Sequence, residues 1–146
     1  MGIKWNLKED FLFYDVKPQE AAEIYTKRKI LKKAATVFDP LGFLAPFTIK
    51  AKIILQNLWR QNLDWDEPID EENQKAWESW LKELNVISTS IRIPRSLDLL
   101  PTHNVQLHMF CDASEKAFAA VAYIRIEEGE NVRCCLLLFA KPKVAL

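Results

Sequence analysis

NVQLHMFCDA (residues 104–113), FAAVAYIRI (118–126) and VRCCLLLFA (132–140) are three consecutive stretches with the composition of β-strands. In the first stretch polar and apolar side chains alternate, so Asp112 shares a face with His108. The second and third stretches are almost continuously apolar, as is typical of strands buried on both sides. We therefore predict an antiparallel meander of three strands with both faces covered.

Upstream of this meander the apolar residues recur with a helical period. We predict a first helix over residues 26–38 with Thr26 as its N-cap. A second helix begins near Pro46, because proline suits a first turn, where its missing N–H has no partner. A third spans residues 70–84 and is capped by Asp70. The apolar stripes of these helices are Ile30, Leu31, Ala34, Ala35 and Phe38; Phe47, Ala51, Ile54, Leu55 and Leu58; and Ala76, Trp77, Trp80, Leu81 and Leu84.

Two features refine the helical region. The sequence Asp-Pro-Leu-Gly at residues 39–42 must end the first helix, because proline disfavours a helical residue before it. Four large aromatic rings lie close together in the sequence and would form an aggregating surface if they were exposed, so we expect them to be substantially buried. They are Trp59, Trp65, Trp77 and Trp80.

The N-terminal residues 1–16 have the pattern of a hairpin. Ile3 and Trp5 alternate with polar neighbours, and residues 11–16 are strand-like. The sequence therefore predicts an α+β chain with an N-terminal hairpin, a helical module and a C-terminal three-stranded antiparallel meander.

Composition excludes several classes of protein. The chain has 146 residues, of which 49% are hydrophobic and 27% charged, so a folded core is expected. No apolar run approaches the roughly 18 residues of a membrane span, and we expect no membrane association. Two of the three cysteines, Cys134 and Cys135, are adjacent, which argues against a disulfide framework. We expect a reducing, intracellular location such as the cytoplasm.

The charges are balanced overall but segregated along the chain. Residues 27–60 carry eight basic side chains and one acidic one, whereas residues 61–90 carry eight acidic and two basic. One hypothesis is that the basic segment contacts a phosphate backbone. The alternative is that the two segments pair with each other within the fold. The candidate nucleic-acid-binding residues are Lys29, Lys32, Lys33, Lys50 and Lys52.

The sequence contains potential catalytic residues, but they lack the usual motifs around them. His108 and Cys111 point to opposite faces of a strand, so they cannot share a metal ion. No nucleophile-elbow pattern surrounds Ser114. The nearest match to an aspartic-peptidase loop, residues 112–114, lacks the required glycine, which excludes that activity. Two interpretations of Asp112 are possible. It is either a turn residue or a carboxylate ligand for Mg²⁺.

Several segments closely resemble the Pao family of retrotransposons, which belongs to the BEL/Pao group of LTR elements. They are TKRKIL (26–31), FDPLGFLAP (38–46), IKAKIILQ (49–56), LDWDE (63–67), IPR (93–95) and FCDASEKA (110–117). The resemblance covers nearly the whole chain, and it implies a fragment of a Pol polyprotein. The family has been described as a peptidase, but the missing glycine argues against that description here.

The resemblance implies a division into four parts. Residues 1–18 would be the end of the reverse transcriptase palm with its primer-grip-like hairpin, and residues 19–62 the thumb. Residues 63–103 would be the connection, and residues 104–146 an incomplete RNase H-like domain.

The resemblance also implies a role for Asp112 as one of the carboxylates that bind Mg²⁺ in a complete RNase H domain. The others would lie beyond Leu146, and the polymerase aspartates before Met1. We therefore expect no cofactor and no activity for this chain alone, although it would derive from an RNA-directed DNA polymerase with RNase H activity. Its partners would be an RNA–DNA duplex and the rest of Pol.

Two alternatives remain open. The chain is either a non-enzymatic nucleic-acid-binding domain or the product of a decayed element without function. The second alternative is favoured by departures from the family pattern, with Ala119 in place of a glycine and an altered sequence at residues 142–146.

Overall fold

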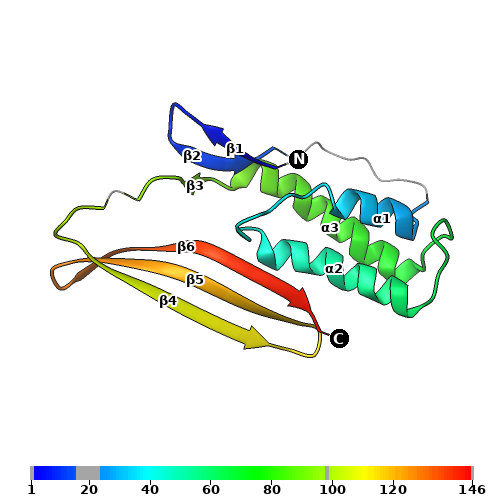
Figure 1. Cartoon of the computed structure of the whole chain (residues 1–146). Coiled ribbons are helices and arrows are strands. Elements are labelled where there is room, and N and C mark those ends of the chain that lie inside the picture. Colours follow the sequence, from blue (N-terminus) through cyan, green and yellow to red (C-terminus); the bar gives the residue numbers. More distant parts are fainter. Residues whose placement is uncertain (1, 16–23, 98, 146) are drawn as a thin grey trace.

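The computed structural model describes residues 2–15, 24–97 and 99–145, and these form an α+β fold, as predicted (Figure 1). In chain order the elements are β1 (Ile3–Asn6), β2 (Phe11–Tyr14), α1 (Lys27–Ala34), α2 (Ala45–Arg60), α3 (Glu71–Ser90), β3 (Ile93–Pro94), β4 (Asn104–Ala113), β5 (Ala117–Glu128) and β6 (Asn131–Val144). The boundary expected between residues 18 and 19 lies outside the described residues. None of the helices in the described ranges has the length and apolarity needed to cross a membrane.

The predicted N-terminal hairpin is present, and it belongs to a small sheet of order β1-β2-β3. Ile3 pairs with Tyr14 across the hairpin. The short strand β3 reaches β2 from the far end of α3, and Phe11 pairs with Pro94. This third strand was not predicted, because two residues carry no recognisable strand pattern.

The first helix is shorter than predicted. Thr26 caps it as expected, accepting a hydrogen bond from the Lys29 N–H, but the helix ends at Ala34 instead of continuing to residue 38. The amides of Thr36 and Val37 donate to carbonyls three residues earlier, and these tight turns redirect the chain before the proline. Phe38, which was expected on the buried face of this helix, therefore lies outside the core and is 63% exposed.

Helices α2 and α3 agree more closely with the prediction. Pro46 occupies the first turn of α2. The carboxylate of Asp70 caps α3 by accepting the Asn73 N–H at 2.7 Å. The third helix runs on past residue 84 to Ser90, and Ala76, expected on its inner face, is exposed.

The core lies between the three helices and the small sheet. Trp80 stacks on Phe47 and on Trp77, with ring centroids 4.5 Å and 4.6 Å apart, and its indole N–H donates to the Phe47 carbonyl. By contrast Trp59 and Trp65 are 45% and 43% exposed, so the expectation that all four rings are buried is wrong for these two. They pack edge to face against each other at the surface instead.

The predicted meander forms a separate sheet of order β4-β5-β6. Its face with Val121 and Ala140 lies toward the start of α2, as Figure 1 shows for β6 and α2. On the opposite face Leu107 and Met109 are 63% and 70% exposed. The expectation that both faces are covered is therefore wrong for the described residues, because all three helices lie on one side.

The loop between α1 and α2 joins the helices to this sheet. The Ala140 N–H donates to the Leu41 carbonyl at 2.9 Å. Gly42 has a φ of +76°, and a Cβ there would lie 1.7 Å from the Ala140 carbonyl oxygen. Asp39 holds the loop by accepting hydrogen bonds from the Tyr14 hydroxyl and the Leu44 N–H. Burial, and then the neighbouring Asp39 carboxylate, raise the pKa of Tyr14.

Candidate functional site

Asp112 lies next to the end of β4, which is an edge strand of the large sheet. It pairs with Ala119 of β5, which in turn pairs with Pro142 of β6. The carboxylate is exposed, and its Oδ1 accepts the N–H of the following Ala113 at 2.8 Å. Strand alternation places it on the face that is turned toward the start of α2.

Asp112 is among the lining residues of two hollows. One, of about 310 Å³, lies between the sheet and the start of α2 and is lined by Asp112, Ser114 and Pro46 among others. The other, of about 680 Å³, includes Lys141 and Lys143 of β6. Asp112 is the sole carboxylate among the described residues that line either hollow.

The polar groups of the turn after β4 form hydrogen bonds within the turn. The Ser114 hydroxyl accepts hydrogen bonds from the N–H groups of Lys116 and Ala117, and the Ser114 N–H donates to the Ala117 carbonyl at 2.8 Å. On the same strand, His108 shares a hydrogen bond with the Gln106 side chain. None of the hydrogen bonds among the described residues joins Ser114 or His108 to Asp112.

The donor set around Asp112 does not fit a magnesium ion by itself. Mg²⁺ requires several oxygen ligands in near-octahedral geometry. The described residues contain no group of three or more His, Cys, Asp or Glu side chains that could hold a metal. Asp112 is the carboxylate that the described lining of the two hollows offers to an ion, and we assign no catalytic step to a metal bound by this chain.

Comparison with known families decides where this architecture belongs. A family model described as the Pao retrotransposon-like RNaseH-like domain matches residues 26–146. The chain belongs to this family. Searches of curated proteins and of solved structures return no match. The resemblance seen in the sequence is thus confirmed, and one match covers both the helices and the large sheet of the Pao domain.

The five candidate lysines of the Pao domain do not form one continuous surface. Lys29, Lys32 and Lys33 share the outward face of α1, as expected for spacings of three and four residues. Lys50 and Lys52 are two residues apart on α2 and therefore diverge.

The lysines also differ in their partners. Lys50 forms an ion pair with Glu83 of α3 at 2.7 Å, and Lys29 donates to the Ile24 carbonyl. None of the ion pairs among the described residues involves Lys32, Lys33 or Lys52. Partial burial lowers the pKa of Lys33.

Some of the segregated charges pair within the Pao domain, as the alternative hypothesis required. Arg28 of α1 meets Asp66 in two hydrogen bonds, at 2.8 and 3.0 Å. These bonds raise the pKa of Arg28 and lower that of Asp66. With the Lys50–Glu83 pair, they join the basic and acidic segments at two points.

The sequence did not predict that Lys27 is a buried cation. Lys27 is only 6% exposed, and its ammonium lies 5.7 Å from the centroid of Trp59 and 5.6 Å from that of Trp65. It also donates to the Leu63 carbonyl. The position of Lys27 on the same side of α1 as Ile30 was the available signal, since that side faces the core.

Proposed function

We propose that this Pao RNase H-like domain binds an RNA–DNA duplex as part of a retrotransposon Pol polyprotein. The observation that carries the proposal is the outward face of α1, where Lys29, Lys32 and Lys33 stand together without a carboxylate partner in any ion pair of the described residues. Membership of the RNase H-like family supports a nucleic-acid partner.

The physical basis is the release of counterions. Each phosphate that a lysine neutralises frees condensed cations, so binding weakens steeply as salt increases. Three contacts through the lysines of α1 weaken the affinity roughly fortyfold between about 50 and 200 mM salt. Lys50 contributes less, because its charge is already compensated by Glu83.

We further propose that residues before β4 derive from the reverse transcriptase thumb and connection, as the resemblance implies. Asp112 would then be one carboxylate of a complete RNase H site. Its place at the end of an exposed edge strand, beside two hollows, supports this assignment. A single carboxylate holds Mg²⁺ weakly, so the isolated chain is expected to be inactive.

The binding proposal is tested by fluorescence anisotropy with a labelled RNA–DNA hybrid at two salt concentrations. A Lys32→Ala/Lys33→Ala double variant should bind more weakly and should reduce the salt slope by roughly two. The matched control is Lys82→Ala, which removes an exposed lysine from the acidic helix α3. Binding that does not depend on salt concentration, or the absence of binding at low salt, would reject the proposal. Either result would favour the alternative that the chain is the product of a decayed element without function.

A further inference from the structure

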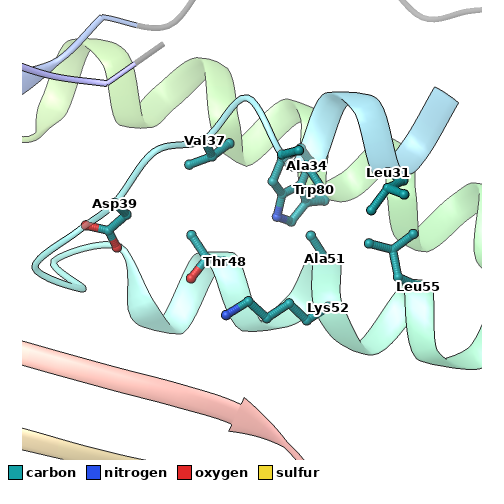
Figure 2. Close-up of a pocket in the computed structure, with 10 residues that line it drawn as sticks. Leu31, Ala34, Val37, Asp39, Thr48, Ala51, Lys52, Leu55 and Trp80 are labelled. Carbon is teal, nitrogen blue, oxygen red and sulfur yellow. The ribbon is translucent and has the colours of Figure 1, made fainter. Parts of the chain in front are cut away.

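A third hollow, of about 310 Å³, lies between α1, α2 and the loop that joins them. Figure 2 shows Trp80 at its back, with Leu31 and Leu55 at one end. Thr48 and Asp39 lie at the opposite end, and the stem of Lys52 runs along the lower edge. The hollow thus combines an apolar interior with a few polar groups at one end, as binding pockets do.

The hollow exists because of two features of the sequence. Ala34 and Ala51 face each other across it, and their small side chains leave space in front of the Trp80 ring, which is itself only 2% exposed. The early end of α1 leaves Ala35 exposed at the edge and Leu31 36% exposed. Part of the apolar stripe of α1 is therefore open to an external side chain.

The two helices that border the hollow carry charge of one sign. Every charged side chain on α1 and α2 is basic. The one carboxylate on the lining, Asp39, already accepts the Tyr14 hydroxyl at 2.6 Å and the Leu44 N–H at 2.8 Å. Lys52, in contrast, takes part in no ion pair among the described residues. Among the described residues, the charged group of the lining that lacks a partner is thus the Lys52 ammonium, so a complementary occupant brings a negative charge to it.

We propose that this hollow docks an acidic protein segment, which inserts one large apolar side chain between α1 and α2 and places a neighbouring carboxylate against Lys52. Its volume is at the lower end of the range for ligand sites, about 300 Å³, and suits a single side chain better than a drug-sized molecule. The partner is thus a protein with an acidic segment around an exposed Phe or Leu.

A nucleic acid is a poorer occupant of the hollow than this segment. Phosphates gain nothing from an apolar interior, and the side of α1 that lines the hollow, with Leu31, Ala34 and Ala35, is not the side that carries Lys29 and Lys33. The docking site is therefore distinct from the lysine face assigned to the duplex, and both partners can bind at once.

The test uses a fluorescein-labelled peptide in which one phenylalanine is flanked by glutamates, titrated with the whole chain. Ala35→Trp places an indole over the edge of the hollow, and it should weaken peptide binding about tenfold. The matched control is Thr36→Trp, at an exposed neighbour that does not line the hollow. Lys52→Ala should also weaken binding, whereas Lys50→Ala on the opposite side of α2 should not.

Three results would overturn the proposal. The first is equal binding of a peptide with serine in place of phenylalanine, since charge alone would then explain the affinity. The second is unchanged binding by Ala35→Trp, with circular dichroism showing a folded chain. The third is competition by an RNA–DNA hybrid together with loss of hybrid binding in Ala35→Trp, which would assign the hollow to nucleic acid. Normal hybrid binding by Ala35→Trp with peptide binding lost would support docking of a protein segment.

Discussion

The guanidinium of Arg95 forms two hydrogen bonds with the carboxylate of Asp10, at 2.6 and 3.2 Å, across 85 positions of the chain. The same guanidinium lies 4.5 Å from the centroid of the Trp5 ring, whose N–H also donates to Asp10. The backbone N–H of Arg95 donates to the Asp10 carbonyl. The residue that follows β3 therefore holds the turn of the N-terminal hairpin.

This pair predicts a specific pH dependence. The hydrogen bond from Arg95, and then that from Trp5, lower the pKa of Asp10. A carboxyl group with a lowered folded pKa stabilises the fold above its unfolded pKa of about 3.9, and this contribution is lost as the pH falls through the folded value. Arg95→Ala should therefore lower the melting temperature more near neutral pH than near about pH 2, where only the contact of Arg95 with Trp5 is lost. A melting difference that is the same at both pH values would contradict this assignment.

The Lys27 site predicts a loss of stability that depends on charge rather than on side-chain length. Lys27→Met keeps most of the apolar stem but removes the ammonium that lies between Trp59 and Trp65 and donates to the Leu63 carbonyl. Unfolding in urea should show a loss of about 1–3 kcal/mol. The control Lys32→Met, on the outward face of α1, should change the free energy of unfolding by less than about 0.5 kcal/mol. Equal losses in the two variants would argue against the cation–π site.

The two positive-φ glycines provide a matched pair. At Gly42 a methyl group would collide with the Ala140 carbonyl, whereas at Gly129, with a φ of +62°, nothing lies within 4 Å of an added Cβ. Gly129→Ala should therefore cost only the backbone penalty, about 1–2 kcal/mol. Gly42→Ala should cost about 3 kcal/mol or more, because the loop must also separate from β6. Similar melting temperatures for the two variants would show that the loop can move away freely.

Asp112 predicts a contrast between the isolated chain and a longer Pol protein. Asp112→Asn should leave the stability of the chain nearly unchanged, because the side chain is exposed and its one hydrogen bond among those of the described residues is local. Purified chain should not cleave the RNA strand of a hybrid in Mg²⁺. Within a complete Pol protein the same substitution should abolish RNA cleavage and leave DNA synthesis largely intact. Cleavage by the isolated chain that is lost in Asp112→Asn would overturn the proposed dependence on further carboxylates.

Local patterns were enough to predict most of the secondary structure. The alternation of side chains in residues 104–113 predicts a strand, and Asp70 predicts the start of α3, because both signals depend on neighbours close in the sequence. The α+β class follows from the change of period at the start of the meander. The family resemblance carried by the sequence is confirmed by a match over residues 26–146.

Tertiary structure decided the features that depend on distant residues. The early end of α1 opens the hollow beside Ala35, and Trp59 and Trp65 meet at the ammonium of Lys27 from α1. The close approach of Gly42 to Ala140 and the pairing of Asp10 with Arg95 join residues that no local period relates. Side-chain periodicity reports which residues share a face of one element. Which faces meet, and which lysines keep a free charge, is determined by contacts between elements far apart in the chain.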